Sequence, residues 1–197
     1  MRLQRIFSFE QLKELYEKEA VRDFPKEELK PLSTMKCLME KDLYRAFGFY
    51  EQENLCAYAF FVCLPKGQTA LLDYFAVLPP YRSLGIGSKI LSLFIEIHKD
   101  LFGILIEVEN PKFSSTKEEK NLRERRIDFY ERNGALKTEI YLSLFQVPFE
   151  ILYLPISQTL TKSSIQKELT NLYSAFIPEQ YWKKRGCEKS PMKKERF

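Results

Sequence analysis

The feature that most limits the fold is a strand–helix–strand unit in the middle of the chain. Residues 69–78 suit a buried strand, and residues 85–100 carry apolar side chains at helical spacing. The segment from Phe102 to Glu109 is almost continuously apolar in its first half, which is typical of a strand buried on both faces, as in parallel pairing. Two such strands joined by a helix imply a right-handed parallel crossover.

The segments around this unit predict antiparallel pairing and flanking helices. Residues 43–51 and 54–64 are separated by the polar turn Gln52-Glu53 and predict a hairpin, and two more strands are expected at 136–147 and 149–156. We therefore expect an α/β (α+β) fold with a single mixed, mostly antiparallel central sheet flanked by helices. A first helix is expected over 8–19, after a capping box formed by Ser8 and Gln11, and a second helical stretch begins at Pro25 and is broken at Pro31. Two later helices are expected to begin at capping boxes, one formed by Ser115 with Glu118 and ending at Gly134, the other formed by Ser163 with Gln166.

Length and charge indicate one domain followed by a basic tail. The chain has 197 residues, of which 45% are hydrophobic, and a formal net charge of +4. Residues 183–197 hold seven Lys or Arg against two Glu, so residues 1–182, the expected domain, are nearly neutral. The excess charge is therefore poor support for a nucleic-acid partner.

The chain start lacks the features of a signal peptide, and no apolar run could span a bilayer. We expect a soluble cytoplasmic protein with no membrane partner, whose last helix could pack across a homodimer.

The single histidine and the four cysteines argue against several chemistries. His98 falls late in a helical segment, where its positive form would favour the helix C-terminus, and we expect a structural role for it. The cysteines form no Cys-x-x-Cys pair and have no histidine at zinc spacing, so neither a metal site nor a cysteine nucleophile is expected. Cys56 and Cys63 lie in an apolar run and are expected to be buried thiols.

The junction between the strand at 69–78 and the following helix predicts a phosphate site. A buried strand runs through Pro79-Pro80 into a helix start that contains Gly85 and Gly87. Free N–H groups at a helix start carry the positive end of the dipole, glycines let a ligand approach closely, and Arg82 adds a charge. The alternative is a plain turn with glycines at the helix start. The P-loop pattern is absent, and a dinucleotide fingerprint would need glycine where Ile90 stands.

Two segments carry a resemblance to a known family. The run Val77-x-Pro79-x-Tyr81-Arg82-x-x-Gly85-x-Gly87-Ser88 resembles the acetyl-CoA-binding motif of GNAT-type N-acetyltransferases, Arg/Gln-x-x-Gly-x-Gly/Ala. The run Phe129-Tyr130-Glu131-Arg132-Asn133-Gly134-Ala135 is similar to that family's second segment, Phe-Tyr-x-x-x-Gly-Phe. Their spacing and the order of elements also agree over residues 1–156. The resemblance implies the GNAT acyl-CoA N-acyltransferase fold and acetyl-CoA as co-substrate, with no metal.

The resemblance also implies roles for individual residues. The backbone of Phe75, Ala76 and Val77 would pair with the pantetheine arm, and Tyr130 would lie near the thioester sulfur as general acid. Many members carry Asn seven residues before that tyrosine and Ala four before it, where this chain has Arg123 and Arg126; Asn121 lies nearby as a candidate contact. The pyrophosphate would sit on the amides of Arg82, Ser83, Leu84, Gly85, Ile86, Gly87 and Ser88.

Acyl transfer from a thioester also needs a group that takes the proton of the attacking amine. Candidates are Asp73 on the strand before the motif, and Glu107 and Glu109, which share one face of the next strand because side chains alternate. Each could instead form a salt bridge or lie exposed, and Tyr130 could be a core aromatic residue. Three acids near one cleft would favour a cationic amine.

Two classes of function remain open from the sequence. The first is an N-acetyltransferase acting on a primary amine of a small molecule or peptide. The second is an acyl-CoA-binding module without turnover, which would serve as a sensor or interaction protein. The acceptor itself has no signature, although residues 20–42 and 145–150 would shape its pocket by analogy with the family.

Overall fold

The computed structural model describes residues 1–144 and 147–177, in which one seven-stranded sheet carries the fold. The basic tail expected at 183–197 lies outside these residues. The strand order is β1-β2-β3-β4-β5-β7-β6, and all neighbours are antiparallel except β4 and β5. The strands are β1 (Arg2–Ile6), β2 (Tyr44–Glu51), β3 (Asn54–Cys63), β4 (Thr69–Val77), β5 (Gly103–Glu109), β6 (Leu136–Leu144) and β7 (Val147–Pro155).

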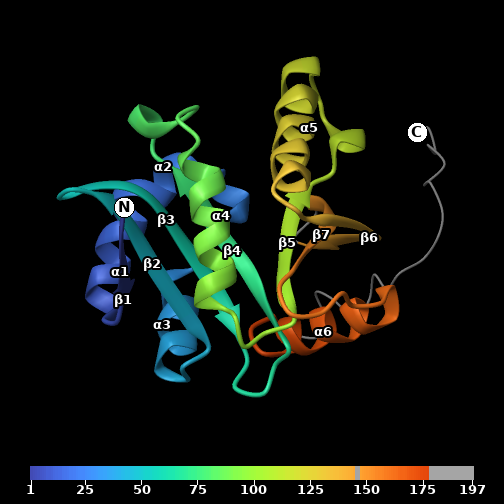
Figure 1. The fold of residues 1–197 in the computed structure, drawn as a ribbon, viewed down its shortest axis with the longest axis horizontal. Coiled ribbons are helices and arrows are strands. Elements are labelled where there is room, and N and C mark those ends of the chain that lie inside the picture. Colours follow the sequence, from blue (N-terminus) through green and yellow to red (C-terminus); the bar gives the residue numbers. More distant parts are fainter. Residues whose placement is uncertain (145–146, 178–197) are drawn as a thin grey trace, which may run out of the picture.

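The parallel pair β4 and β5 is joined by the crossover helix α4 (Ile86–Ile97), as expected. Their register runs only from Thr69 opposite Gly103 to Leu72 opposite Ile106. Beyond these residues the two strands diverge. Figure 1 shows that they separate toward their C-terminal ends, which lead into α4 and α5. The second half of β4 therefore has a strand neighbour on the β3 side only, among the described residues.

A bulge in β4 sits at the point where the two strands part. Phe61 faces Leu72 and Phe60 faces Tyr74, so Asp73 is an extra residue in β4. A bulge interrupts the alternation of side chains and strengthens the local twist. As a result the neighbours Asp73 and Tyr74 both reach the face covered by the N-terminal helices: Asp73 contacts Tyr44, and Tyr74 belongs to the same core cluster as Tyr44.

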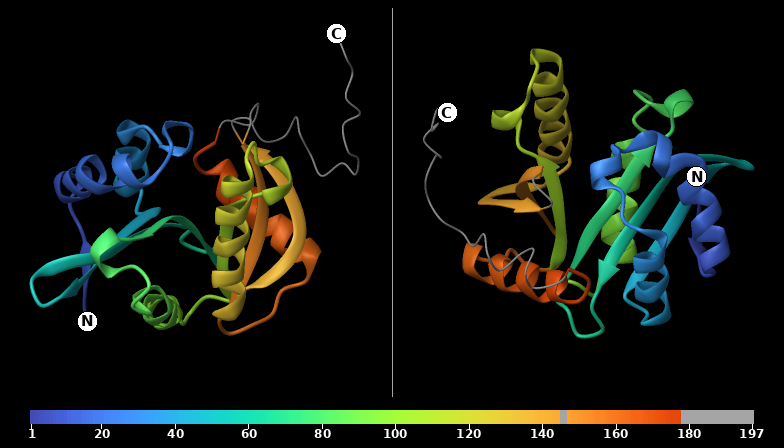
Figure 2. Two further views of the ribbon diagram at one scale, coloured as in Figure 1. Left: turned by 90° about the horizontal axis from the view of Figure 1, so that it is seen from above. Right: turned by 180° about the vertical axis from the view of Figure 1, so that it is seen from behind.

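Helices cover both faces of the sheet, each over its own apolar core. One core contains α1 (Phe9–Leu15), α3 (Leu32–Glu40) and α6 (Lys162–Ser174), and the opposite core contains α4 and α5 (Lys117–Arg132). In Figure 2 the N-terminal helices and α4 lie on opposite sides of the sheet. None of the helices in the described part of the chain combines the length and apolar character needed to cross a bilayer.

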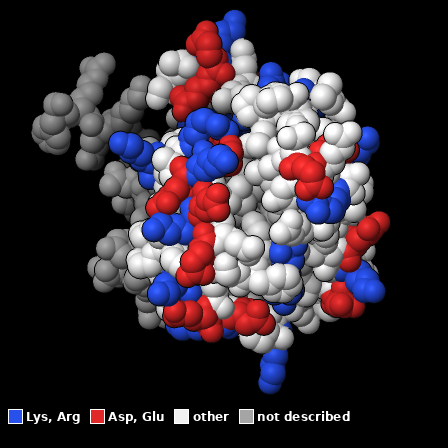
Figure 3. Space-filling model, turned by 90° about the vertical axis from the view of Figure 1, so that its left-hand side faces the viewer, with Lys and Arg blue, Asp and Glu red and all other residues white. Residues whose placement is uncertain are grey.

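The outer surface near the N-terminus carries both signs of charge. On the face drawn in Figure 3, Lys and Arg are interspersed with Asp and Glu. Ion pairs of this kind include Arg5 with Asp42 at 3.7 Å and Lys13 with Glu17 at 3.9 Å. The face drawn therefore lacks the one-signed basic stripe that nucleic-acid binding favours.

The mixed sheet flanked by helices is confirmed, but one strand and several helix boundaries differ. Strand β1 was not predicted, because only its last residue, Ile6, is buried. The first helical segment continues past residue 19, through a π-helical turn (Tyr16–Ala20) into α2 (Val21–Asp23). The capping boxes expected at Ser115 and Ser163 were wrong: Thr116 caps α5 and Thr161 caps α6.

His98 lies buried at the end of α4, with 2% of its surface exposed. Its Nδ1 lies 3.1 Å from the carbonyl oxygen of Phe94, and its Nε2 lies 3.9 Å from the thiol of Cys63. Burial lowers the pKa of His98 to about 4, and the charge of Arg45 acts in the same direction. His98 is therefore neutral near pH 7, and it does not act at this helix end through a positive charge. Cys56 and Cys63 are buried, as predicted.

We expect the buried His98 to lower the free energy of unfolding as the pH falls. Its pKa is about 4 in the folded state and about 6.5 when unfolded, so the unfolded chain binds more protons between these values. Between pH 7 and pH 4 the free energy of unfolding should fall by about 3 kcal/mol more in the wild type than in His98→Gln. Denaturant unfolding across this pH range measures the difference, and equal slopes would contradict the assignment.

Candidate active site

A cleft of about 1110 Å³ opens where β4 and β5 diverge. Its walls come from the second half of β4, the start of α4, one face of α5 and the segment between α2 and α3. The end of α6 and the adjoining ends of β6 and β7 also contribute. Of the predicted acids, Asp73 and Glu107 line this cleft, together with Tyr130 and the backbone segment Phe75 to Val77.

The loop that enters α4 forms one end of the cleft with unpaired amides. Ser83 and Gly85 have φ angles of 63° and 74°, a region that favours glycine. A side chain at Gly85 would meet nothing within 4 Å, so the loop is open on that side. No acceptor is found among the described residues for the backbone N–H groups from Ser83 to Ser88. These amides and the positive end of α4 create a site for an anion.

The arginines of the site have unequal roles. Arg82 turns back onto its own loop: its Nε donates to the carbonyl of Val77 at 2.8 Å, and it lies 3.3 Å from Asp23. Arg125, Arg126 and Arg132 line the cleft from α5. Asn121, predicted as a contact to the coenzyme, is exposed on α5 and does not line the cleft.

Tyr130 lies in the wall formed by α5, with 7% of its surface exposed. Burial raises the pKa of its hydroxyl to about 12, and the charge of Arg126 opposes this rise. The hydroxyl therefore stays protonated near neutral pH and can act as a proton donor. The neighbouring ring of Phe129 lies 3.0 Å from where a side chain of Gly87 would begin, so a larger residue there would press against this ring and displace it by a few tenths of an ångström.

Two of the predicted acids form the floor of the cleft and are already hydrogen-bonded. Asp73 accepts from the ammonium of Lys30 and from the hydroxyl of Tyr44, and its side chain is 1% exposed. Glu107 accepts from the hydroxyl of Tyr173 on α6. Burial raises the pKa of Glu107, while the charge of Lys30 and the Tyr173 hydrogen bond oppose the rise.

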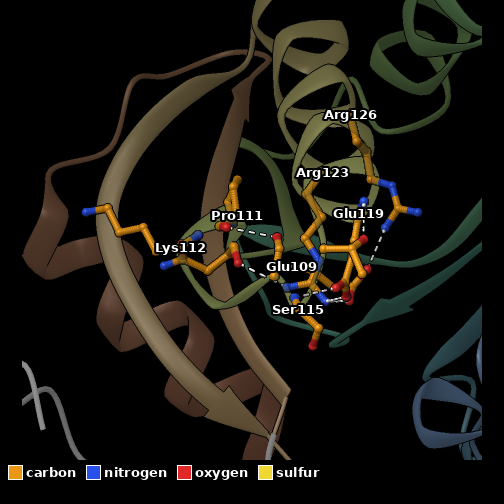
Figure 4. Close-up of polar contacts among 10 residues, drawn as sticks. Glu109, Pro111, Lys112, Ser115, Glu119, Arg123 and Arg126 are labelled. Atoms are coloured by element: carbon orange, nitrogen blue, oxygen red, sulfur yellow. Dashed lines mark hydrogen bonds and ion pairs between the residues drawn. The ribbon is translucent and has the colours of Figure 1, made fainter. Parts of the chain in front are cut away.

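The third predicted acid, Glu109, belongs to a charge network beside the cleft rather than to its lining. Figure 4 shows Arg123 and Arg126 reaching down from α5 toward Glu109. Arg123 donates to Glu109 at 2.6 Å, to Glu119, and to the carbonyl of Asn110 at 3.1 Å. Arg126 lies 3.4 Å from the other oxygen of Glu109.

A further carboxylate, Glu28, lines the cleft and was not predicted from the sequence. It ends a 3₁₀ turn (Lys26–Glu28) between α2 and α3. Burial raises the pKa of Glu28 to about 7, the negative charges of Glu109 and Glu107 add to the rise, and Arg126 and Arg123 oppose it. The acids that act on it, Glu107 and Glu109 on β5, lie some 80 residues away in the sequence, so no local pattern marks it as a site residue.

The sequence profile of the Acetyltransferase (GNAT) family matches residues 9–135, which is more than half of the chain. The chain belongs to the GNAT acetyltransferase family. The matched region contains the amide-rich loop, the diverging strands and Tyr130, whereas the parts of the cleft wall that β6, β7 and the end of α6 supply lie beyond it. No match was found among curated protein sequences.

Solved structures of GNAT acetyltransferases share this fold at low identity. A GNAT-family protein from Bacteroides thetaiotaomicron superposes with a TM-score of 0.68 at 19% identity, covering 90% of this chain and 98% of that one. The ribosomal-protein-S18-alanine N-acetyltransferase of Escherichia coli gives 0.57 at 19% identity, over 81% and 97%. An aminoglycoside 6′-N-acetyltransferase complexed with coenzyme A gives 0.55 at 14% identity, over 81% and 99%.

The Arg123 network leads to a prediction about the stability of this acetyltransferase. Arg123→Met removes the side-chain donor of the Asn110 carbonyl, which keeps only the N–H of Phe113 at 3.1 Å, and removes one of the two arginines from Glu109. We expect the free energy of unfolding to fall by about 3 kcal/mol, because one partner of a buried ion pair is lost.

The control for this prediction is Lys120→Gln on the same helix. It removes an exposed pair with Glu124 at 3.6 Å and should cost no more than about 0.5 kcal/mol. Thermal and denaturant unfolding measure both changes. If the two variants were equally stable, Arg123 would not be a structural residue of α5.

Proposed function

We propose that this chain is an N-acetyltransferase that moves an acetyl group from acetyl-CoA to a primary amine by direct attack within a ternary complex. One observation carries the proposal. The unpaired half of β4 runs directly into the unpaired amides before α4, and Tyr130 lines the same cleft. An extended arm with a thioester at one end and phosphates at the other matches this order of groups.

Acetyl-CoA is the co-substrate in this proposal. The pantetheine arm would lie along Phe75, Ala76 and Val77, where β4 has no neighbour on the β5 side. The pyrophosphate would bind the N–H groups from Ser83 to Ser88 at the positive end of α4. Arg125, Arg126 and Arg132 add positive charge along the α5 wall of the cleft.

The chemistry requires little more than placement and proton transfer. A thioester is already activated, and holding it in line with the amine is worth about 7–11 kcal/mol. A backbone N–H on β4 would stabilise the oxyanion. Tyr130, protonated at neutral pH, would supply the proton that the departing sulfur takes.

The acceptor is proposed to be a cationic amine of a small molecule or peptide. The cleft beyond the unpaired edge of β4 is lined by Glu28, Asp73 and Glu107, of which Asp73 pairs with Lys30, while Glu28 and Glu107 have no ion-pair partner among the described residues. Negative charge concentrated in a cleft attracts cations. The names of two structural neighbours give an alanine of ribosomal protein S18 and an aminoglycoside as their acceptors, and both are amines.

The alternative is a module that binds acyl-CoA without turnover. The same amides and the same strand edge would serve it, but it would have no use for a protonated tyrosine and several acids beside the thioester position. Isothermal titration with CoA and a thiol-release assay separate the two. Tight CoA binding without thiol release from any amine would favour the module.

We expect Tyr130→Phe to slow catalysis while leaving coenzyme binding intact. Removing a general acid should lower kcat about 100-fold or more, and the Kd for CoA should change little because the ring stays in place. The assay follows thiol release from acetyl-CoA with spermidine, kanamycin or an alanine-terminated peptide as acceptor. Tyr141→Phe, at an exposed position on β6, is the matched control. Equal rates for the two variants would remove Tyr130 from the mechanism.

A further inference from the structure

We infer that Glu28 is the proton acceptor of this enzyme, taking the proton of the incoming ammonium before it attacks the thioester. The inference rests on the proposed function and assigns the base to a residue outside the sheet. The sequence indicated Asp73, Glu107 and Glu109 for this task, all on β4 and β5.

The backbone that carries Glu28 is held firmly at the rim of the cleft. The hydroxyl of Tyr74 donates to the carbonyl of Glu28 at 2.7 Å and accepts from the N–H of Lys30 at 2.8 Å. The hydroxyl of Tyr16 donates to the carbonyl of Lys30 at 2.8 Å. Two buried tyrosines therefore fix the segment, so the carboxylate is presented from a defined position rather than from a loose loop.

Glu28 is the one carboxylate of the cleft lining that lacks a partner among the described residues. Asp23 pairs with Arg82 and accepts from Tyr58, Asp73 pairs with Lys30, and Glu107 accepts from Tyr173. No hydrogen bond or ion pair reaches the side chain of Glu28 within residues 1–144 and 147–177. A base must have a free lone pair for the substrate, and partnered acids are less able to supply it.

The charges around Glu28 suit a base that works near neutral pH. Burial of the carboxylate is the largest cause that raises its pKa; from β5, Glu109 and Glu107 add to the rise, and from α5, Arg126 and Arg123 oppose it. On β4, Asp73 is neutralised by Lys30, and Tyr74 contacts only the backbone of Glu28. The resulting pKa of about 7 lies close to the working pH, which is the best value for a general base.

The Glu28 carboxylate takes one proton from the ammonium, and the freed nitrogen lone pair forms the C–N bond to the thioester carbonyl carbon. The C–S bond breaks with its electron pair on sulfur, which takes a proton from the Tyr130 hydroxyl. The second proton, now acidic on the acylated nitrogen, returns to Tyr130, and Glu28 releases its own proton to solvent.

The test is the pH dependence of kcat/KM for the wild type and Glu28→Gln, with the same three amines as acceptors. The wild type should show a rising limb near pH 7, where Glu28 loses its proton. In Glu28→Gln, kcat/KM near pH 7.5 should fall about 100-fold, and the limb should move toward the pKa of the free acceptor amine. Glu28→Asp keeps the carboxylate and should keep the limb near pH 7 at a lower rate.

A second readout does not depend on activity. The folded-state pKa of Glu28 is raised, so its carboxylate destabilises the folded protein increasingly as pH rises above its ordinary value. Glu28→Gln should therefore have a higher Tm than the wild type at pH 8, and the two Tm values should converge near pH 4, below the pKa of an unfolded glutamate. Glu14→Gln, at an exposed position of α1, should change neither Tm nor the pH profile.

The outcomes separate the inference from the proposed function. Thiol release by the wild type together with an unchanged limb in Glu28→Gln would overturn the assignment of Glu28 alone. A lower rate in Glu28→Gln with the limb still near pH 7 would also overturn it, because a merely structural residue acts in that way. If the wild type released no thiol with any amine, the proposed function and the assignment of Glu28 would fall together.

Discussion

The end of the parallel pairing between β4 and β5 is the constraint on which the site depends. After Leu72 and Ile106 the strands have no common ladder, and the extra residue Asp73 gives β4 a stronger twist at that point. The backbone groups released on β4 must find other partners, because unpaired N–H and C=O groups are costly when buried. A cleft lined by such groups is suited to an extended polar chain, and everything else in the site is arranged around it.

The same bulge also determines how charge is distributed in the cleft. By bringing Asp73 and Tyr74 to one face, it lets Asp73 accept from Lys30 while Tyr74 holds the backbone beside Glu28. On the other side, Arg123 and Arg126 pair with Glu109. Two of the acids are thus neutralised by the protein's own cations. Their pairing leaves Glu28 without a partner and concentrates the uncompensated negative charge of the lining on Glu28 and Glu107.

Features that depend on local sequence were predictable, and features that depend on distant residues were not. The strands and the crossover could be predicted because the spacing of apolar residues along the chain shows which faces are buried. Helix starts were displaced because Ser114, Ser115 and Thr116 are all able caps, and only the final packing selects Thr116. Strand β1 is an edge strand with little burial. The environment of Glu28 arises from residues on β5 and α5 that are far from it in sequence, so only the fold reveals it.

Lys30 connects the elements that surround the acceptor side. It pairs with Asp73, and its ammonium lies 5.6 Å from the ring of Tyr74 and 5.0 Å from that of Phe176, just beyond α6. Through these contacts Lys30 holds the segment after α2 against the sheet and the end of α6. Because the ammonium of Lys30 already pairs with Asp73, this carboxylate would not bind the ammonium of an acceptor. In the proposed reaction the acceptor would be attracted instead to Glu28 and Glu107, which no cation pairs with, and its nitrogen would approach the rim where Glu28 lies.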